Sequence, residues 1–376
     1  DFVVITISTG DLDAMEPDLV IPERYGIFQT VGDTVGPGGW ARAMRNIPVF
    51  ERIAAQCVKY CPQAFILNYT NPMATLTQTL AQCTPQPVVG LCHGLFENYR
   101  HLMRIFKCER EDDIRATYGG VNHFFWMLDF TVKGQPGLPL LQRKLRGGKR
   151  LDDLMSTAYR DEAGHGSLRR LVASELFEEF GILPYFGDRH TSEFFGRYLA
   201  PARDRLKPYA LQRTSIAERR RMFRHRQAYV AQLASGKREI ELKPSRETAA
   251  DIMAARCAGR EFVDVMNLPN VGQIENLPRG AVVETPGLIN ATGFAAVAVG
   301  ALPVPIQTVV LPHALNQALI VGAARTGDWE MAYQALINDP LCSHLSIPKI
   351  KAMGRKLLEA NRAFLPRFFG RHRRSP

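Results

Sequence analysis

Three short apolar runs, separated by two segments with helical spacing, constrain the fold of this chain more than any other feature of its 376 residues. FVVITIS (2–8), AFILNYT (64–70) and PVVGLC (87–92) are rich in β-branched residues, as are parallel strands that are buried on both faces. Apolar residues recur at helical spacing over 41–62 and 73–83. The order strand, helix, strand, helix, strand predicts an α/β fold with a doubly wound, mostly parallel sheet.

Residues able to bind ligands follow each of the three predicted strands. Sites in doubly wound sheets lie beyond the carboxyl ends of the strands. The residues at these ends are Ser8, Thr9 and Gly10, then Asn68 and Asn71, then Cys92 and His93. A well-formed turn would also use the Asn-Pro step that follows the second strand, so the asparagines alone do not decide between a turn and a site. The three strand ends together predict a site at this edge of the sheet.

From Tyr118 onward the strand–helix alternation gives way to strand pairs and longer helical stretches. The elements expected are a glycine-rich loop at 31–40, a strand pair over 118–132, helices over most of 151–235, turn-rich short strands over 266–293 and helices from 315 to about 369. We place a boundary after residue 125. Residues 1–125 are then the remainder of a dinucleotide-binding domain, and 126–376 are a C-terminal α+β region that completes the site.

One expected motif is absent. A dinucleotide-binding sheet of the Rossmann type usually opens with a strand, G-x-G-x-x-G and a helix, with an acidic residue about 20 positions later. No segment of this chain has that pattern. We therefore interpret 2–8 as a middle strand of a Rossmann-like sheet. We expect that the first βαβ half, on the order of 60 residues, is not in this chain.

Composition bounds the setting of the protein. Seven cysteines without a repeating spacing favour reduced thiols and a cytoplasmic location. No apolar run reaches the roughly 18 residues that a membrane span needs, so we expect no membrane. The net charge of +10 comes largely from segments 143–150, 217–226 and 367–376, which we interpret as solvated faces, since no nucleic-acid-binding module accompanies them. Steering of anionic substrates such as uronides is the alternative.

Cys92 and His123 form the first chemical constellation. Cys92 ends a predicted strand, and His123 stands in GVNHFF at the start of another. Thiolate and imidazole both bind borderline transition metals, and a pair of protein ligands leaves positions open for substrate oxygens. A lone cysteine and a lone histidine are more often core or surface residues, so the spacing by itself leaves both interpretations open.

The segment GDRHTSEFF (187–195) forms the second constellation. It places Asp188, Arg189, His190 and Glu193 close together after an apolar run. One interpretation is a salt-bridged helix start with Asp188 as its cap. The other is the wall of a site, with an arginine fork for a carboxylate and Tyr185 or His190 as a base.

In their order and spacing these segments resemble glycoside hydrolase family 4 over nearly the whole chain. The motifs that carry the resemblance are PERYGIFQTVGDTVGPGG (22–39), RAMRNIPVF (42–50), NYTNPM (68–73), GLCHG (90–94), GVNHF (120–124), GDRHTSEFF (187–195) and NLPNVGQIENLPRGAVVETPG (267–287). They look most like the α-galacturonidase branch, with α-galactosidases and α-glucosidases close to it.

The resemblance implies a lactate or malate dehydrogenase-like fold and a glycosidase that uses NAD and a divalent metal, usually manganese. In that mechanism NAD oxidises carbon 3 of the sugar, a base removes the proton on carbon 2, and the glycosidic bond is lost by elimination before water adds back. The metal polarises the oxygens at carbons 2 and 3. Family members commonly form homo-oligomers, so a dimer or tetramer is expected.

The resemblance also implies roles for individual residues. Carried over by position, Cys92 and His123 are metal ligands, Asn71 contacts the sugar, Asn68 lies near the nicotinamide, and His93 occupies the place of a general acid. The base is usually a tyrosine in relatives whose local pattern differs here, so Tyr185 and His190 are candidates for it, and Arg189 is the candidate for the carboxylate of a uronide. We add Asn122 as a sugar contact, and Ser8, Thr9 and Gly10 at the end of the first strand as cofactor contacts. A histidine could protonate a leaving oxygen because its unperturbed pKa is about 6.5.

Two other readings compete with the glycosidase. A lactate- or malate-type dehydrogenase would need no metal. A truncated, inactive relative would have lost its nucleotide site and would leave a sheet edge exposed.

Overall fold

The three apolar runs at the start of the chain form a parallel layer. The computed structural model describes residues 1–155, 169–242 and 245–370. Strands β1 (Phe2–Ile5), β2 (Phe65–Asn68) and β3 (Val88–Gly90) pair in parallel, with Val4 beside Leu67 and Leu67 beside Val89. Two helices, over Asp11–Glu23 and Gly36–Tyr60, connect β1 to β2, and one, over Met73–Cys83, connects β2 to β3. The second and third were predicted, whereas the first was not. The Rossmann-like part of the predicted fold is confirmed.

The C-terminal α+β region continues this layer as antiparallel strands. In the described parts of the chain the strands form one ten-stranded sheet in the order β1-β2-β3-β8-β9-β4-β5-β6, with β10 on β9 and β7 on β5. The further strands are β4 (Ile114–Val121), β5 (Phe124–Val132), β6 (Gln135–Pro136), β7 (Leu183–Pro184), β8 (Phe262–Pro269), β9 (Val282–Asn290) and β10 (Gly293–Ala296). The predicted strand pair over 118–132 is β4 and β5, and residue 125 lies inside β5.

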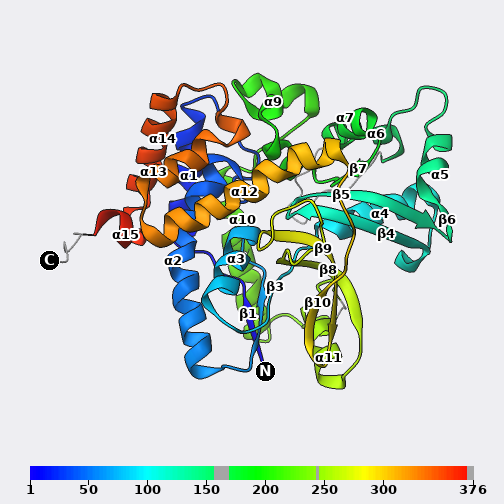
Figure 1. Ribbon diagram of the computed structural model, residues 1–376, viewed down its shortest axis with the longest axis horizontal. Helices are drawn as coiled ribbons and strands as arrows, with labels where there is room; N and C mark the ends of the chain where they lie inside the picture. Colours follow the sequence, from blue (N-terminus) through cyan, green and yellow to red (C-terminus); the bar gives the residue numbers. More distant parts are fainter. Residues whose placement is uncertain (156–168, 243–244, 371–376) are drawn as a thin grey trace.

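The helices from the two ends of the chain lie on the left of Figure 1, and the antiparallel strands lie on the right together with helices from the middle of the chain. The helices are α1 (Asp11–Glu23), α2 (Gly36–Tyr60), α3 (Met73–Cys83), α4 (Gly94–Phe106), α5 (Gly137–Lys144), α6 (Leu151–Leu154), α7 (Leu171–Phe180), α8 (Asp188–Thr191), α9 (Gly196–Leu199), α10 (Ile216–Ala234), α11 (Ala249–Ala258), α12 (Val304–Thr326), α13 (Trp329–Ile337), α14 (Ile347–Ala360) and α15 (Pro366–Phe369). Short 3₁₀ turns are η1 (Glu111–Asp113), η2 (Ser192–Phe194), η3 (Arg203–Tyr209), η4 (Pro340–Cys342) and η5 (Arg362–Phe364).

Helix α2 begins earlier than the glycine-rich segment 31–40 suggested. The predicted loop gives way to helix at Gly36, and Pro37 stands in the first turn, where its fixed φ suits a helix. The free N–H of Gly36 donates to Asp339 Oδ2 at 3.0 Å, and that of Gly38 donates to Gln29 Oε1 at 2.7 Å. Because these distant side chains satisfy the helix start, the glycines can remain helical.

Helix α12 is long and apolar enough to cross a membrane by length and composition alone, although no such stretch was expected from the sequence. In the fold it packs against α2, α3 and α13, and Ile306, Val310 and Ala314 are buried in the main core. We therefore assign it as a core helix. Segment 156–168, within the predicted helical stretch 151–235, and residues 371–376 of the basic tail lie outside the described residues.

Candidate active site

His123 occupies the tight connection between β4 and β5. Its backbone has φ +62°, the left-handed region that few non-glycine residues adopt. The ring is buried, and Nδ1 lies 2.9 Å from the hydroxyl of Thr34. The turn thus presents a buried imidazole at the end of β4, with its Nδ1 beside a hydroxyl.

Asp33 and His190 converge on His123. One ligand atom from each of the three residues lies within 4.8 Å of the other two. The rings of His123 and His190 are 4.0 Å apart between centroids, and His190 Nδ1 lies 3.8 Å from Asp33 Oδ1. Two imidazoles and a carboxylate at this spacing form a ligand set for a divalent transition metal.

The electrostatics of this group suit a cation. Burial lowers the pKa of His123, and neighbouring His190 lowers it further, so the ring is kept neutral. Burial also lowers the pKa of His190. Burial would raise the pKa of Asp33, but His190, His123 and Arg42 hold it at about 2, so the carboxylate stays ionised. Asp33 was not predicted as a site residue from the sequence, although it lies in the family motif at 22–39.

Cys92 borders this group at the end of β3. Its Sγ accepts the N–H of Gly94 at 3.4 Å, and the ring of Tyr185 lies over the same glycine. Burial raises the pKa of the thiol, and Glu284 and Asp33 raise it further. In the described parts of the chain, Cys92 is not among the residues whose ligand atoms lie within 4.8 Å of one another. Cys92 therefore lies beside the group rather than within it.

A buried glutamate holds the loop that carries Asp33. Glu193 Oε1 accepts the N–H groups of Val31 at 2.7 Å and Gly32 at 2.9 Å, and it lies 3.2 Å from the hydroxyl oxygen of Thr30. Burial raises the pKa of Glu193 to about 7. The glutamate of the segment 187–195 thus fixes the backbone on which the carboxylate of Asp33 stands.

Asp188 and Arg189 of the same segment have positioning contacts. Asp188 accepts the N–H groups of Val172 at 2.9 Å and Ala173 at 3.0 Å, so it caps α7 rather than its own helix. Arg189 Nη2 donates to Thr30 O at 3.1 Å and to the Thr214 hydroxyl at 2.8 Å, and the hydroxyl of Thr30 donates back to Arg189 O. The guanidinium therefore ties the Asp33 loop to the segment before α10.

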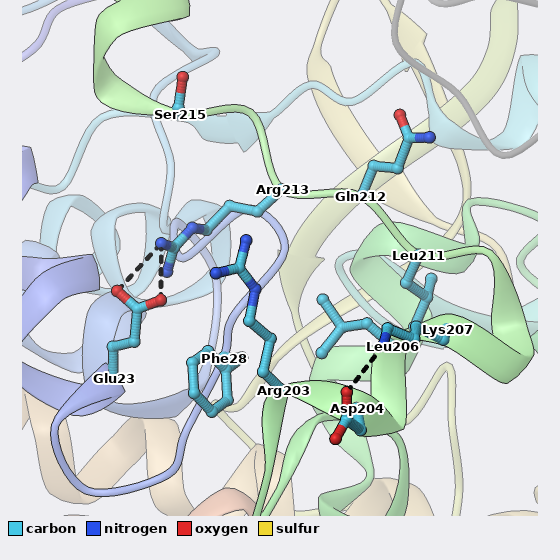
Figure 2. A pocket seen from close by; sticks show the side chains of 10 residues that line it. All are labelled: Glu23, Phe28, Arg203, Asp204, Leu206, Lys207, Leu211, Gln212, Arg213 and Ser215. Carbon is cyan, nitrogen blue, oxygen red and sulfur yellow. Dashed lines mark hydrogen bonds and ion pairs between the residues drawn. The ribbon is translucent and has the colours of Figure 1, made fainter.

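That segment runs along a cavity of about 630 Å³ (Figure 2). The lining residues are Glu23, Phe28, Arg203, Asp204, Leu206, Lys207, Leu211, Gln212, Arg213 and Ser215. Arg213 Nη2 donates to both oxygens of Glu23, at 3.0 and 3.1 Å. Ser215 then starts α10 with a capping box that includes Glu218. These contacts fix the start of α10 beside the Asp33 loop.

Tyr185 lies against both histidines. Its ring centroid is 6.0 Å from that of His123 and 6.3 Å from that of His190, and its hydroxyl donates to Glu97 Oε2 at 3.5 Å. Burial and Glu97 raise the pKa of Tyr185 well above its usual value. Arg170 holds Glu97 in a 2.5 Å ion pair. The structure thus brings both candidate bases, Tyr185 and His190, to His123.

Comparison with known proteins agrees with the resemblance seen in the sequence. The model of the family 4 glycosyl hydrolases matches residues 1–107, and that of the family 4 C-terminal domain matches residues 118–342. The chain belongs to family 4 of the glycosyl hydrolases. It is therefore a glycoside hydrolase, and the predicted family and enzyme class are confirmed.

Similar proteins include two α-galacturonidases. That of Bacillus subtilis is 35% identical over 353 residues, which are 91% of this chain and 77% of the relative. That of Lachnoclostridium phytofermentans is 33% identical over 383 residues, which are 98% of this chain and 81% of the relative. A B. subtilis crystal structure named as a glucosidase has a TM-score of 0.86 at 32% identity and covers 95% of this chain and 83% of its own.

The other predicted site residues of this family 4 chain vary in exposure. Asn68 is buried, and its amide group accepts Thr70 N–H at 2.9 Å and donates to the Thr77 hydroxyl at 3.1 Å. Asn71 Oδ1 accepts Met73 N–H at 3.2 Å. His93 is exposed, and its Nδ1 lies 3.4 Å from Glu247. Both asparagines thus shape the NYTNPM turn, while His93 faces outward.

The residues after β1 form a turn at the same strand-end edge. Gly10 has φ +77° and starts α1, and a Cβ there would lie 2.5 Å from that of Ala14. Buried Arg45 donates to Thr9 O at 3.0 Å and pairs with Asp18 at 2.6 Å. Ser8 precedes this turn and is exposed. The turn is therefore tied to α1 and α2.

Glu284, a fully buried carboxylate on β9, was also not predicted as a site residue from the sequence. Its Oε2 accepts the amide N–H groups of Asn122 at 2.8 Å and Asn267 at 2.9 Å. Burial raises its pKa to about 7. Asn122 precedes His123 in the β4–β5 connection, so Glu284 anchors the connection that presents His123.

Proposed function

We propose that this family 4 enzyme is an α-galacturonidase that requires NAD and a divalent metal, with Mn²⁺ as the preferred ion. The observation that carries the proposal is the convergence of Asp33, His123 and His190 at the strand-end edge of a Rossmann-like sheet. The α-galacturonidase names of relatives at 33% and 35% identity support the substrate class. A family 4 neighbour from Thermotoga maritima was solved with manganese, NAD⁺ and glucose-6-phosphate, and at 20% identity and TM-score 0.74 it supports the shared fold.

The residues present fit a metal. Neutral imidazoles and an ionised carboxylate, with a thiol alongside, are donors that a borderline divalent ion accepts. His123, Asp33 and His190 would hold the ion, and Cys92 would join them as a thiolate. The Thr34 hydroxyl beside His123 Nδ1 would orient that ring, as outer-shell partners of metal-binding histidines do.

The turn after β1 fits a dinucleotide at the carboxyl end of a parallel layer. Ser8, Thr9 and Gly10 would border the cofactor, and the glycine permits close approach of a ligand to the backbone. Asn68 would act through the NYTNPM turn, because its amide group is already engaged with Thr70 and Thr77.

When bound, NAD would supply a reversible hydride acceptor for carbon 3 of the sugar, reoxidised before the product leaves, and a metal held by Asp33, His123 and His190 would supply a Lewis acid for the sugar oxygens. Tyr185 takes the proton from carbon 2, because its ring lies against His123 and it is outside the candidate metal group. His190 is the alternative base only if it does not bind the metal. His93 protonates the leaving oxygen from its exposed position. Asn71 and Asn122 donate and accept hydrogen bonds with the sugar hydroxyls.

The test is release of 4-nitrophenol from its α-galacturonide by the full protein, with and without NAD, Mn²⁺ and a thiol reductant. We expect hydrolysis that needs NAD and metal and is lost in Cys92→Ser. The α-galactoside and α-glucoside are the comparison substrates, and Cys257→Ser, an exposed cysteine, is the matched control. Hydrolysis of a comparison substrate in preference to the galacturonide would overturn the substrate class. Hydrolysis without NAD or metal would overturn the cofactor assignment.

A further inference from the structure

Two arginines flank the Asp33 loop without a carboxylate partner. Arg42 lies on α2, where its Nε donates to Asn71 O at 3.0 Å and its Nη1 lies 4.0 Å from Met15 Sδ. Within residues 1–155, 169–242 and 245–370, no carboxylate oxygen lies within 4.0 Å of its guanidinium. The Nε contact fixes the group to the NYTNPM turn and leaves the terminal nitrogens for another acceptor.

Arg219 approaches from the other side, in the first turn of α10. Its Nη2 lies 3.4 Å from Val31 O and its Nε lies 3.5 Å from Thr214 O. It too has no ion pair within the described parts of the chain. These contacts are long and go to neutral carbonyl groups, so they position the guanidinium without neutralising it.

The start of α10 is fixed, so Arg219 is held near the Asp33 loop. Ile216 packs with Met15 and Leu19, and Met15 is the residue that Arg42 also contacts. The Arg213–Glu23 pair in Figure 2 and the Ser215 capping box hold the preceding turn. Burial lowers the pKa of Arg219; Asp33 raises it, whereas Arg189 and Arg42 lower it. The two guanidinium groups therefore repel each other beside one carboxylate, Asp33.

We propose that Arg42 and Arg219 together bind the carboxylate at carbon 6 of the uronide substrate. A guanidinium donates paired N–H groups to a carboxylate, and an added anion relieves the repulsion between the two cations. Arg42 touches the Asn71 turn and Arg219 touches the Asp33 loop, so a sugar bound between them lies beside the candidate metal group. The inference rests on the proposed α-galacturonidase function and deepens it.

This assignment changes the role of Arg189. From the sequence we predicted that Arg189 binds the uronide carboxylate. In the structure its Nη2 already donates to Thr30 O and to the Thr214 hydroxyl. Arg189 is then a positioning residue, because it holds the Asp33 loop and the segment before α10 beside the proposed carboxylate site.

The test compares Arg42→Gln and Arg219→Gln with Arg52→Gln and Arg220→Gln. Arg52 lies on the same helix as Arg42 and is exposed, and Arg220 follows Arg219 but pairs with Asp13 and Glu16. Each pair of variants therefore removes the same charge from the same helix. Affinity for free galacturonate and for NAD is measured by titration calorimetry with Mn²⁺ present, and kcat/KM is measured with the 4-nitrophenyl α-galacturonide.

We expect each site variant to weaken galacturonate binding and lower kcat/KM by about 10- to 100-fold, with NAD affinity and the two controls unchanged. A loss of NAD affinity with galacturonate affinity retained would overturn the inference and assign the arginines to the cofactor phosphates. Equal losses in the controls would overturn it as well. Failure of the unaltered enzyme to bind galacturonate or cleave its glycoside would overturn the proposed function itself, whereas full activity in both site variants would overturn only this inference.

Discussion

The rings of His123 and His190 lie 4.0 Å apart between centroids, with Asp33 Oδ1 3.8 Å from His190 Nδ1. The sequence motifs predicted His190 as a candidate base and Cys92 and His123 as the metal ligands. The geometry gives His190 a second candidate role, because it shares a group of ligand atoms with His123 and Asp33. A residue cannot both bind the metal through a ring nitrogen and use that nitrogen as a free base.

Replacing His190 by Gln separates these roles. If His190 is a ligand, we expect Mn²⁺ affinity to fall at least about 10-fold, as loss of a metal-supporting residue typically does. Titration calorimetry in the absence of substrate measures this directly, with His225→Gln on the exposed face of α10 as the control. Unchanged Mn²⁺ affinity together with a large fall in kcat would instead make His190 the base.

Tyr185→Phe tests the other candidate base. The substitution keeps the ring that stacks on His123 and removes the hydroxyl that donates to Glu97. If the hydroxyl takes the proton from carbon 2, kcat should fall about 10²- to 10⁴-fold while Mn²⁺ affinity stays the same. Deuterium at carbon 2 of the substrate supplies the second readout, since the isotope effect on kcat should rise when proton removal is slowed. Wild-type kcat in Tyr185→Phe would exclude the hydroxyl as the base.

Much of the fold could be predicted because it depends on local patterns. The β-branched runs identified β1, β2 and β3, and helical spacing identified α2 and α3. The motifs placed His123 and Cys92 at strand ends, where the structure has them. The antiparallel extension of the same sheet depends on pairing between strands that are far apart in the chain, such as Gly90 beside Asn267. No local pattern encodes such a pair.

The site was predicted less completely for the same reason. Glu193 helps to hold the Asp33 loop beside His190, through hydrogen bonds that join residues 161 and 162 positions apart in the chain. Glu284 has the sequence pattern of an ordinary strand residue, since its importance lies in two distant partners, Asn122 in the β4–β5 connection and Asn267 on β8. Buried polar residues that act through such long-range contacts carry no periodic signal.

Glu284→Ala and Glu284→Gln form a matched pair that tests this anchoring role. Alanine leaves the amide N–H groups of Asn122 and Asn267 buried without their acceptor, which should cost about 2 to 4 kcal/mol of unfolding free energy. Glutamine keeps one oxygen that can accept both, so its stability should stay within about 1 kcal/mol of the wild type. Urea unfolding measures both values, and Mn²⁺ titration of the folded variants should show weaker binding only for the alanine variant. Equal behaviour of the two variants would contradict the anchoring role.

Asp339 gives a pH-dependent prediction that is independent of the metal group. Its buried carboxyl accepts Gly36 N–H at 3.0 Å and Leu341 N–H at 2.9 Å, and burial raises its pKa from 3.8 to about 6. Between these two values the folded state binds the proton more tightly than the unfolded state does. The stability that comes from this residue is therefore present at low pH and is lost as pH rises toward 6, by up to about 3 kcal/mol.

Asp339→Asn removes this titration while keeping an acceptor oxygen at the start of α2. Relative to the variant, the wild type should lose unfolding free energy as the pH rises from 4 to 6.5. The difference between the two proteins should then be constant above pH 7. Urea unfolding at steps of about half a pH unit measures it, with Asp328→Asn, an exposed helix cap, as the baseline. Any constant cost of the asparagine amide cancels, because only the change with pH is compared. A shift in favour of the wild type over the same range would mean that the N–H groups of Gly36 and Leu341 outweigh burial and hold the carboxyl ionised.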